Sequence, residues 1–78
     1  MPIYLFNVNG GEFAVEDLVG CELGSDLHAR DHAILAARDM LAHSVLAGRL
    51  PLDDVINVLT VDGRSVLDLR FGDAVTRV

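Results

Sequence analysis

The sequence contains no lysine, and its six arginines stand singly among twelve acidic residues, which leaves a formal net charge of −6. A nucleic-acid backbone binds clustered cations, because these displace the counterions around its phosphates. An anionic membrane surface attracts the same clusters. We therefore expect neither nucleic acid nor a membrane surface among the partners of this chain.

Cysteine and long apolar runs are also scarce. Cys21 is the single cysteine and cannot form a disulfide within the chain. The apolar runs are only a few residues long, whereas a membrane-spanning helix needs about 20 apolar residues. The first residues lack the basic segment of a signal peptide. These features together favour a reducing, cytoplasmic location.

Short catalytic and phosphate-binding motifs are missing as well. The sequence has no Gly-x-Ser-x-Gly, no Cys-x-x-Cys and no glycine-rich loop before a helix. Cys21 and a histidine could form a nucleophilic pair in principle, but nothing in the sequence brings them into one cleft. We expect no enzyme activity and no cofactor.

Apolar residues, in contrast, make up 51% of the 78 residues. A chain of this length forms one domain, here 1–78, and hides only about 60–65% of the surface that its unfolded chain exposes. The apolar content is therefore generous for the thin core that such a domain can build.

Turn residues divide the N-terminal part of the chain into strands. Aromatic and β-branched residues predict a strand over 2–8, and alternating polarity predicts a second strand over 12–16. The Asn-Gly-Gly sequence at 9–11 predicts the hairpin turn between them. A short extended segment is expected at 21–23.

A helix is predicted over 26–47. Ser25 or Asp26 can accept hydrogen bonds from the first free amides, and Gly48 is a suitable residue just past the end. The spacing of apolar residues predicts which side of this helix meets the core. Its members are Leu27, Ile34, Ala37, Leu41 and Val45, with Ala33 and Met40 at the edge.

Two more strands follow, over 55–61 and 65–71, and Asp62-Gly63 predicts a two-residue turn between them. Asp73 could begin a last helical turn. The order strand–strand–helix–strand–strand predicts an α+β fold, a two-layer sandwich of one long helix on a four-stranded, mainly antiparallel sheet.

The second face of this sheet has no helix to cover it. With a two-residue turn, Val61 opposes Arg64, Leu59 opposes Val66, Val58 opposes Leu67 and Ile56 opposes Leu69. The inner face, toward the helix, then carries Tyr4, Phe6, Val8, Ile56, Val58, Leu67, Leu69 and Phe71. The uncovered face carries Ile3, Leu5, Val55, Leu59, Val61 and Val66. An exposed apolar patch often marks an interface, so we expect a homodimer formed through this face.

Three histidines and an aspartate lie on the polar side of the helix. His28 with His32, and Asp39 with His43, are spaced i,i+4 and could share a metal ion. The distance from His28 to His43 along the helix is about 22 Å, so a full set of ligands is not assembled. A solvated helix surface is the preferred interpretation, and His28 and His32 stay as weak metal candidates.

Arg30 is unusual, because helical spacing places it within the predicted apolar stripe. A buried guanidinium requires a partner. Asp26 is the local candidate and Asp73 the distant one. An internal ion pair is the simpler hypothesis, and an anion-binding arginine is the alternative.

Three segments together resemble a known family. They are Met1-Pro2-x-Tyr4-x-Phe6, Ala29-Arg30-x-x-Ala33-x-x-x-Ala37-Arg38, and Asp62-Gly63-Arg64 followed by Leu67-x-Leu69-x-Phe71-x-Asp73-Ala74-Val75. Their order and spacing resemble a family of small bacterial proteins of unknown function, common in soil and plant-associated proteobacteria. The resemblance implies no catalytic residues. It implies that Arg30, Arg38 and Asp73 belong to a shared pattern, which fits an internal ion pair and equally a binding surface.

The sequence thus favours an uncharacterised, non-catalytic protein-interaction or regulatory module that acts as a homodimer. The alternative is a small-molecule, anion or metal-binding protein that uses the His28/His32 pair or Arg30.

Overall fold

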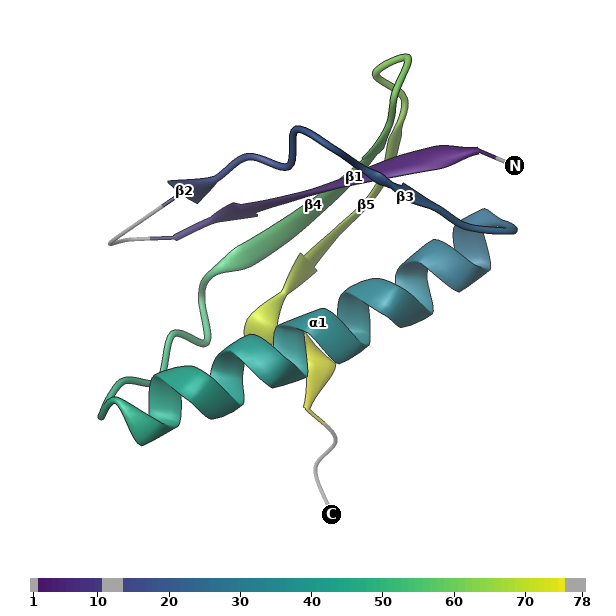
Figure 1. Ribbon diagram of the computed structural model, residues 1–78. Coiled ribbons are helices and arrows are strands. Elements are labelled where there is room, and N and C mark those ends of the chain that lie inside the picture. The colour runs from purple at the N-terminus through teal and green to yellow at the C-terminus, as the bar shows by residue number, and fades with distance from the viewer. Residues whose placement is uncertain (1, 11–13, 76–78) are drawn as a thin grey trace.

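The computed structural model describes residues 2–10 and 14–75 of the chain. One helix lies against one side of an antiparallel sheet (Figure 1). The elements in chain order are β1 (Ile3–Asn9), β2 (Ala14–Val15), β3 (Cys21–Glu22), α1 (Asp26–Leu46), β4 (Val55–Thr60), β5 (Ser65–Arg70) and a 3₁₀ turn, η1 (Phe71–Ala74). The predicted α+β class is confirmed.

The sheet has five strands where four were predicted. Its order is β2-β1-β4-β5, and β3 also pairs with β1, on the same side as β2. The segment predicted as a short extension forms β3, in which Cys21 pairs with Tyr4. Of the predicted second strand, only Ala14–Val15 is a strand, and residues 12 and 13 lie outside the described residues.

A single aspartate closes the gap between β2 and β3 along β1. The amide of Phe6 faces this gap and donates to Asp17 Oδ2 at 3.1 Å. Asp17 Oδ1 accepts from the amides of Val19 and Gly20, and the amide of Asp17 donates to Asn7 Oδ1. Hydrogen bonds from the amides, first that of Gly20, hold the pKa of Asp17 below its usual value. Asp17 therefore supplies the partner for the Phe6 amide that neither β2 nor β3 provides.

Three alanines and Leu41 form the buried side of α1, so the predicted core side is right for Ala37, Leu41 and the edge residue Ala33, while Ile34 and Met40 are half-buried against the core. Ala29, Ala33 and Ala37 are 0% exposed, and Leu41 continues the row. Leu27 and Val45, predicted for the core, are 64% and 54% exposed. The row repeats every four residues, because the helix crosses the sheet obliquely and turns a slightly different side to it at each turn. Ser25 caps the helix by accepting from the amide of His28.

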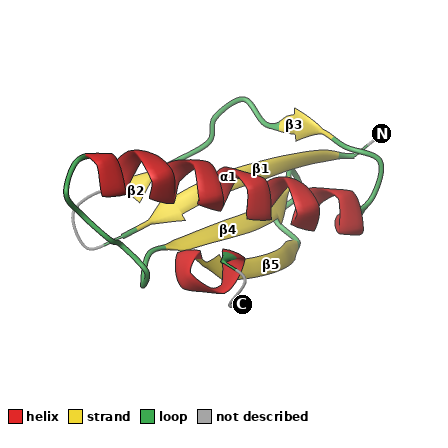
Figure 2. Ribbon diagram, turned by 90° about the horizontal axis from the view of Figure 1, so that it is seen from below, coloured by secondary structure: helices red, strands yellow, loops and turns green. Residues whose placement is uncertain are grey.

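Large residues of the sheet fill the space that the alanines leave. The predicted inner face is confirmed for Tyr4, Val8, Ile56, Val58 and Phe71, all of which are buried. Figure 2 shows α1 running over β1 and β4, with β5 at one margin of the sheet. The core is thus a contact between small helix side chains and large strand side chains.

The predicted register between β4 and β5 is right at one end and wrong at the other. Val58 pairs with Leu67 and Ile56 with Leu69, as predicted, but Leu59 pairs with Ser65. The turn holds three residues, since Thr60 pairs with Arg64, and Gly63 takes a positive φ of 93°. Val66 is the extra residue of a bulge that restores the register, and it packs against the core cluster.

The alanine contact predicts that the free energy of unfolding depends strongly on side-chain size at the buried helix positions. We expect Ala33→Leu to lower the free energy of unfolding by about 1–3 kcal/mol, because the added atoms have no space between helix and sheet. Ala42→Leu, on the exposed side of the same helix, should change it by less than about 0.5 kcal/mol. Urea unfolding followed by circular dichroism measures both variants, and equal effects would contradict the packing described here.

Candidate functional site

A network of three side chains joins the start of α1 to the sheet. Arg64 Nη1 and Nη2 donate to the two carboxylate oxygens of Asp26, each at 3.0 Å. The hydroxyl of the buried Tyr4 donates to Asp26 Oδ1 at 2.7 Å. Asp26 is thus the partner of Arg64 and Tyr4, and not of Arg30 as the sequence suggested.

Hydrogen bonding in this network shifts the pKa of all three groups. The bonds from Arg64, and then the bond from Tyr4, lower the pKa of Asp26. The bond to Asp26 raises the pKa of Tyr4, and burial adds to that rise. The same carboxylate raises the pKa of the Arg64 guanidinium. The network therefore holds one negative charge and one positive charge, which suits a structural tie better than proton transfer.

The histidines are engaged separately and do not form a shared site. His28 Nδ1 accepts from the amide of Gly24 at 3.4 Å, at the start of the helix. The ring of His32 lies 4.9 Å from that of Phe6, centroid to centroid. Across the described ranges, no group of three or more histidine, cysteine, aspartate or glutamate side chains could hold a metal ion.

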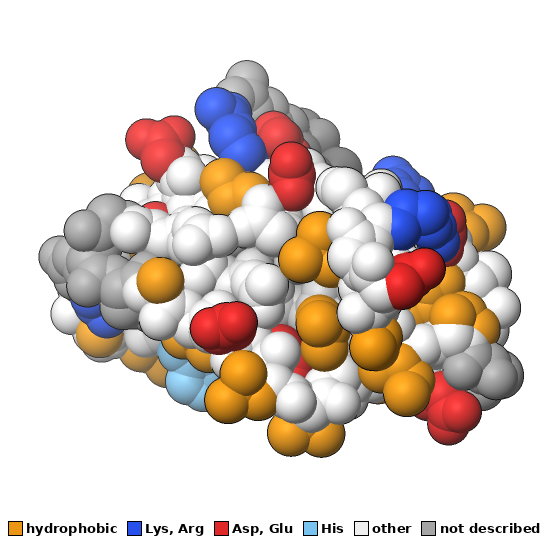
Figure 3. Space-filling model, turned by 90° about the horizontal axis from the view of Figure 1, so that it is seen from above, with side chains coloured by type: hydrophobic (Ala, Val, Ile, Leu, Met, Phe, Trp, Pro, Cys, Tyr) orange, Lys and Arg blue, Asp and Glu red, His pale blue; other side chains and the backbone are white. Residues whose placement is uncertain are grey.

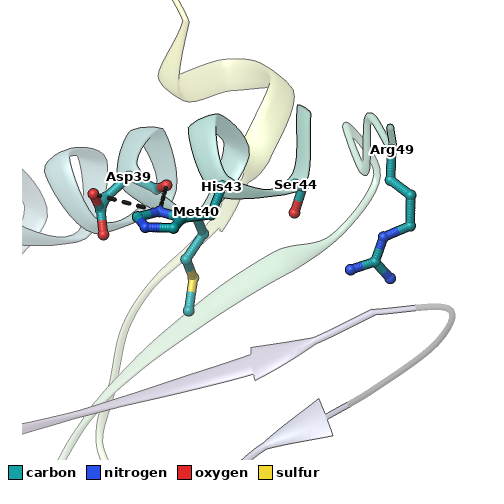
Figure 4. A pocket seen from close by; sticks show the side chains of 5 residues that line it. All are labelled: Asp39, Met40, His43, Ser44 and Arg49. Atoms are coloured by element: carbon teal, nitrogen blue, oxygen red, sulfur yellow. Dashed lines mark hydrogen bonds and ion pairs between the residues drawn. The ribbon is translucent and has the colours of Figure 1, made fainter. Parts of the chain in front are cut away.

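Asp39 and His43 border a small hollow of about 260 Å³ near the end of α1. Figure 4 shows them with Met40, Ser44 and Arg49, the other residues that line it. His43 Nδ1 lies 2.8 Å from the backbone oxygen of Asp39 and 3.8 Å from its Oδ1. The ring is therefore turned back onto its own helix.

The predicted binding residues Arg30, Arg38 and Asp73 are not all brought together. Arg30 is exposed, and its guanidinium Nη1 lies 4.0 Å from Oδ1 of the neighbouring Asp31. Asp73 pairs with Arg70 at 3.7 Å, so the proposed Arg30–Asp73 pair is wrong. The shift of the core side of α1 to the alanine row explains this, because it turns Arg30 out of the core.

Arg38 and Asp73 do line one groove, of about 690 Å³, between the C-terminal half of α1 and η1. Arg38 Nε donates to the backbone oxygen of Ala74 at 2.6 Å, which fixes the guanidinium at the groove wall. Asp53 and Arg70 are the other charged residues of the groove. Its apolar part is formed by Leu41, Val45, Leu50, Leu52 and Val75. Sequence spacing alone missed this site, because its walls come from separate segments.

The outer sheet face alternates between apolar and polar rows. Leu5 and Leu59 form one cross-strand row, and the next holds Asn7, Asn57 and Asp68. Asn57 Nδ2 donates to Asp68 Oδ1 at 2.6 Å, and the side-chain Nδ2 of Asn9 donates to Asn57 Oδ1. Figure 3 shows the result, with hydrophobic side chains interrupted by polar and acidic ones.

The residues predicted for the interface are only partly exposed. Ile3 and Val61 are exposed, whereas Leu5, Val55, Leu59 and Val66 are half-buried. Gly20 lies against this face, since a Cβ at that position would come within 2.6 Å of Ile3 Cγ2. The predicted patch is therefore smaller than the sequence suggested.

Among the described residues, no helix is both long enough and apolar enough to cross a bilayer. The chain is an α+β protein built from one helix on a mainly antiparallel sheet, with a groove at one end of the helix. It belongs to the family described as a domain of unknown function, DUF6894, whose model matches residues 3–72. No curated protein and no solved structure matches it.

The Asp26 network predicts a specific loss of stability in acid. A carboxyl group whose folded pKa is lowered stabilises the fold above its unfolded pKa, about 3.9, and loses that contribution as the pH falls through the folded value. We expect wild type to lose more stability than Asp26→Asn between pH 6 and pH 2.5. Asp53→Asn, at an exposed carboxylate, is the control. Urea midpoints measured across this range test the difference, and identical slopes for wild type and Asp26→Asn would contradict it.

Proposed function

We propose that this protein is a non-catalytic protein-interaction module that acts as a homodimer. The supporting observation is the number of large apolar side chains left in water by the described part of the chain. On the helix and the segment after it, the exposed ones include Leu27, Leu35, Val45, Leu46, Leu50 and Leu52. Exposed apolar surface of this extent favours association with another protein surface.

A binding role fits the chemistry of the side chains better than catalysis does. Cys21 packs against the core from β3, and His28, His32 and His43 are each held by a local contact. Acid–base or nucleophilic catalysis needs such groups converging on one cleft. We propose a cytoplasmic setting for the module, and the lack of clustered cations argues against nucleic acid or a membrane as its partner.

Ligand binding in the groove beside Arg38 is a second candidate function. The observation that favours it is the combination of apolar walls with the guanidinium fixed by Ala74. We expect a short fatty acid such as octanoate to shift the amide resonances of Leu41, Val45 and Leu52 first. A titration followed by ¹⁵N-resolved spectra measures this, and shifts spread evenly over the chain would reject the groove as the site.

Self-association predicts a mass of twice the 8.4 kDa of one chain. We expect sedimentation equilibrium at tens of micromolar to give this dimer, because the exposed apolar side chains gain from leaving water. A dilution series supplies the dissociation constant of the dimer. A single 8.4 kDa species at every concentration would refute the proposed function.

A further inference from the structure

The free edge of β5 is where a second copy can join the sheet. Among the residues that the structure describes, β5 pairs with β4 on one side and with no strand on the other. The opposite margin offers only short edges, since it is formed by the two-residue strands β2 and β3, which bond to β1 together with Asp17. An open edge strand presents unpaired amides and carbonyls that can bond to another strand.

The hydrogen-bond pattern shows which residues of β5 present these groups. The amide of Phe71 donates to the carbonyl of Asp54 at 2.8 Å, so this pair bonds directly across the ladder. In an antiparallel ladder such pairs alternate, and Leu69 with Ile56 is therefore the next bonded pair. The backbone groups of Asp68 and Arg70 consequently point away from β4, toward the free edge.

The side chains of β5 are complementary to a second β5 in one register. Asp68 and Arg70 are exposed and lie on the outer sheet face, two residues apart. If two β5 strands run antiparallel with Leu69 opposite Leu69 of the second copy, each Asp68 lies opposite an Arg70. Both residues of such a pair direct their backbone groups to the partner, so four backbone hydrogen bonds and two ion pairs form together.

Other registers are less favourable. A shift by two residues places Asp68 opposite Asp68, and like charges directly opposite one another are destabilising. The bulge at Val66 and the bond from the amide of Gly72 to Leu52 limit the usable edge at its two ends. The strand therefore selects one antiparallel register.

The side of α1 toward the β5 margin offers a second complementary surface. Asp31, Ile34, Leu35 and Arg38 line a hollow of about 300 Å³ on α1. The bond from Arg38 to Ala74 of η1 places this side of the helix toward the β5 margin. A two-fold axis near Leu69 sets the two helices antiparallel on the same face of the joined sheet. Asp31 of each copy then faces Arg38 of the other, with Ile34 between them.

We propose that two copies of this chain pair through β5, antiparallel about Leu69, to form one continuous sheet with both α1 helices side by side. This inference rests on the proposed homodimer and names its interface. Leu67 and Leu69, which are half-buried in one copy, become covered. The interface is therefore the β5 margin and not the outer sheet face that the sequence suggested.

A charge-reversal pair tests the register directly. We expect Asp68→Arg to raise the dissociation constant of the dimer at least about tenfold, because two ion pairs become two repulsions. Arg70→Asp should act in the same way. The double variant, Asp68→Arg with Arg70→Asp, restores both pairs in reversed order and should return the constant to within about threefold of wild type. Sedimentation equilibrium measures all four proteins, and circular dichroism checks that each is folded.

A second pair of variants tests the helix surface. Asp31→Arg sets a charge of the same sign against Arg38 of the second copy, at a side chain that is exposed in one copy and so not needed for folding. We expect it to weaken the dimer, whereas Leu18→Asp, on a loop beside the opposite edge and 84% exposed, should not.

Three results would overturn the inference. Dimers unchanged by Asp68→Arg and Asp31→Arg would reject this interface while leaving the proposed function intact. If Ile3→Arg dissociates the dimer and these two variants do not, the interface lies on the outer sheet face. A wild-type protein that stays monomeric would reject the interface and the homodimer together.

Discussion

The close contact between the alanine row of α1 and the sheet is the constraint on which the rest of the structure depends. Ala29, Ala33 and Ala37 have no side chain beyond Cβ, so the helix backbone lies near the large residues of β1 and β4. Such a contact excludes water with few atoms, and it leaves no space for leucine at these three positions. The longer apolar residues of α1, among them Leu27 and Leu35, are consequently turned away from the core.

Polar contacts at two places fix the direction of the helix over the sheet. Asp26 ties its first turn to Tyr4 and to Arg64 beside the β4–β5 turn, and Arg38 ties its middle to Ala74. A helix held at both places cannot rotate about its axis without breaking a charged hydrogen bond. The Arg38 side of α1 therefore faces the margin of the sheet where β5 has no neighbour. The same placement forms the groove and the surface proposed for the second copy.

The sequence predicted the element order well, because turn residues and alternating polarity act over a few positions. It predicted the inner face of the sheet, including Tyr4, Ile56 and Val58, since strand residues alternate strictly between two faces. For α1 it was right about Ala37 and Leu41 and placed Ala33 at the edge of the buried side, but it was wrong about Leu27 and Val45, because alanine carries little weight in a hydrophobic pattern next to larger residues. It also failed at Val66, where a three-residue turn requires a bulge that a count of residues does not reveal.

Local signals by themselves determined that this chain forms one helix and a mainly antiparallel sheet, that it is acidic, and that it has more apolar residues than one such layer can cover. Only the tertiary structure decided where the excess lies. The sequence placed it on the outer sheet face, but amide rows occupy much of that face and Gly20 lies against part of it. Much of the excess lies on the helix and on the segment after it, and Leu18 and Val19 add to it on the loop before β3. The rotation of a helix is set by how closely it can approach the sheet, and that distance depends on side chains far apart in the chain.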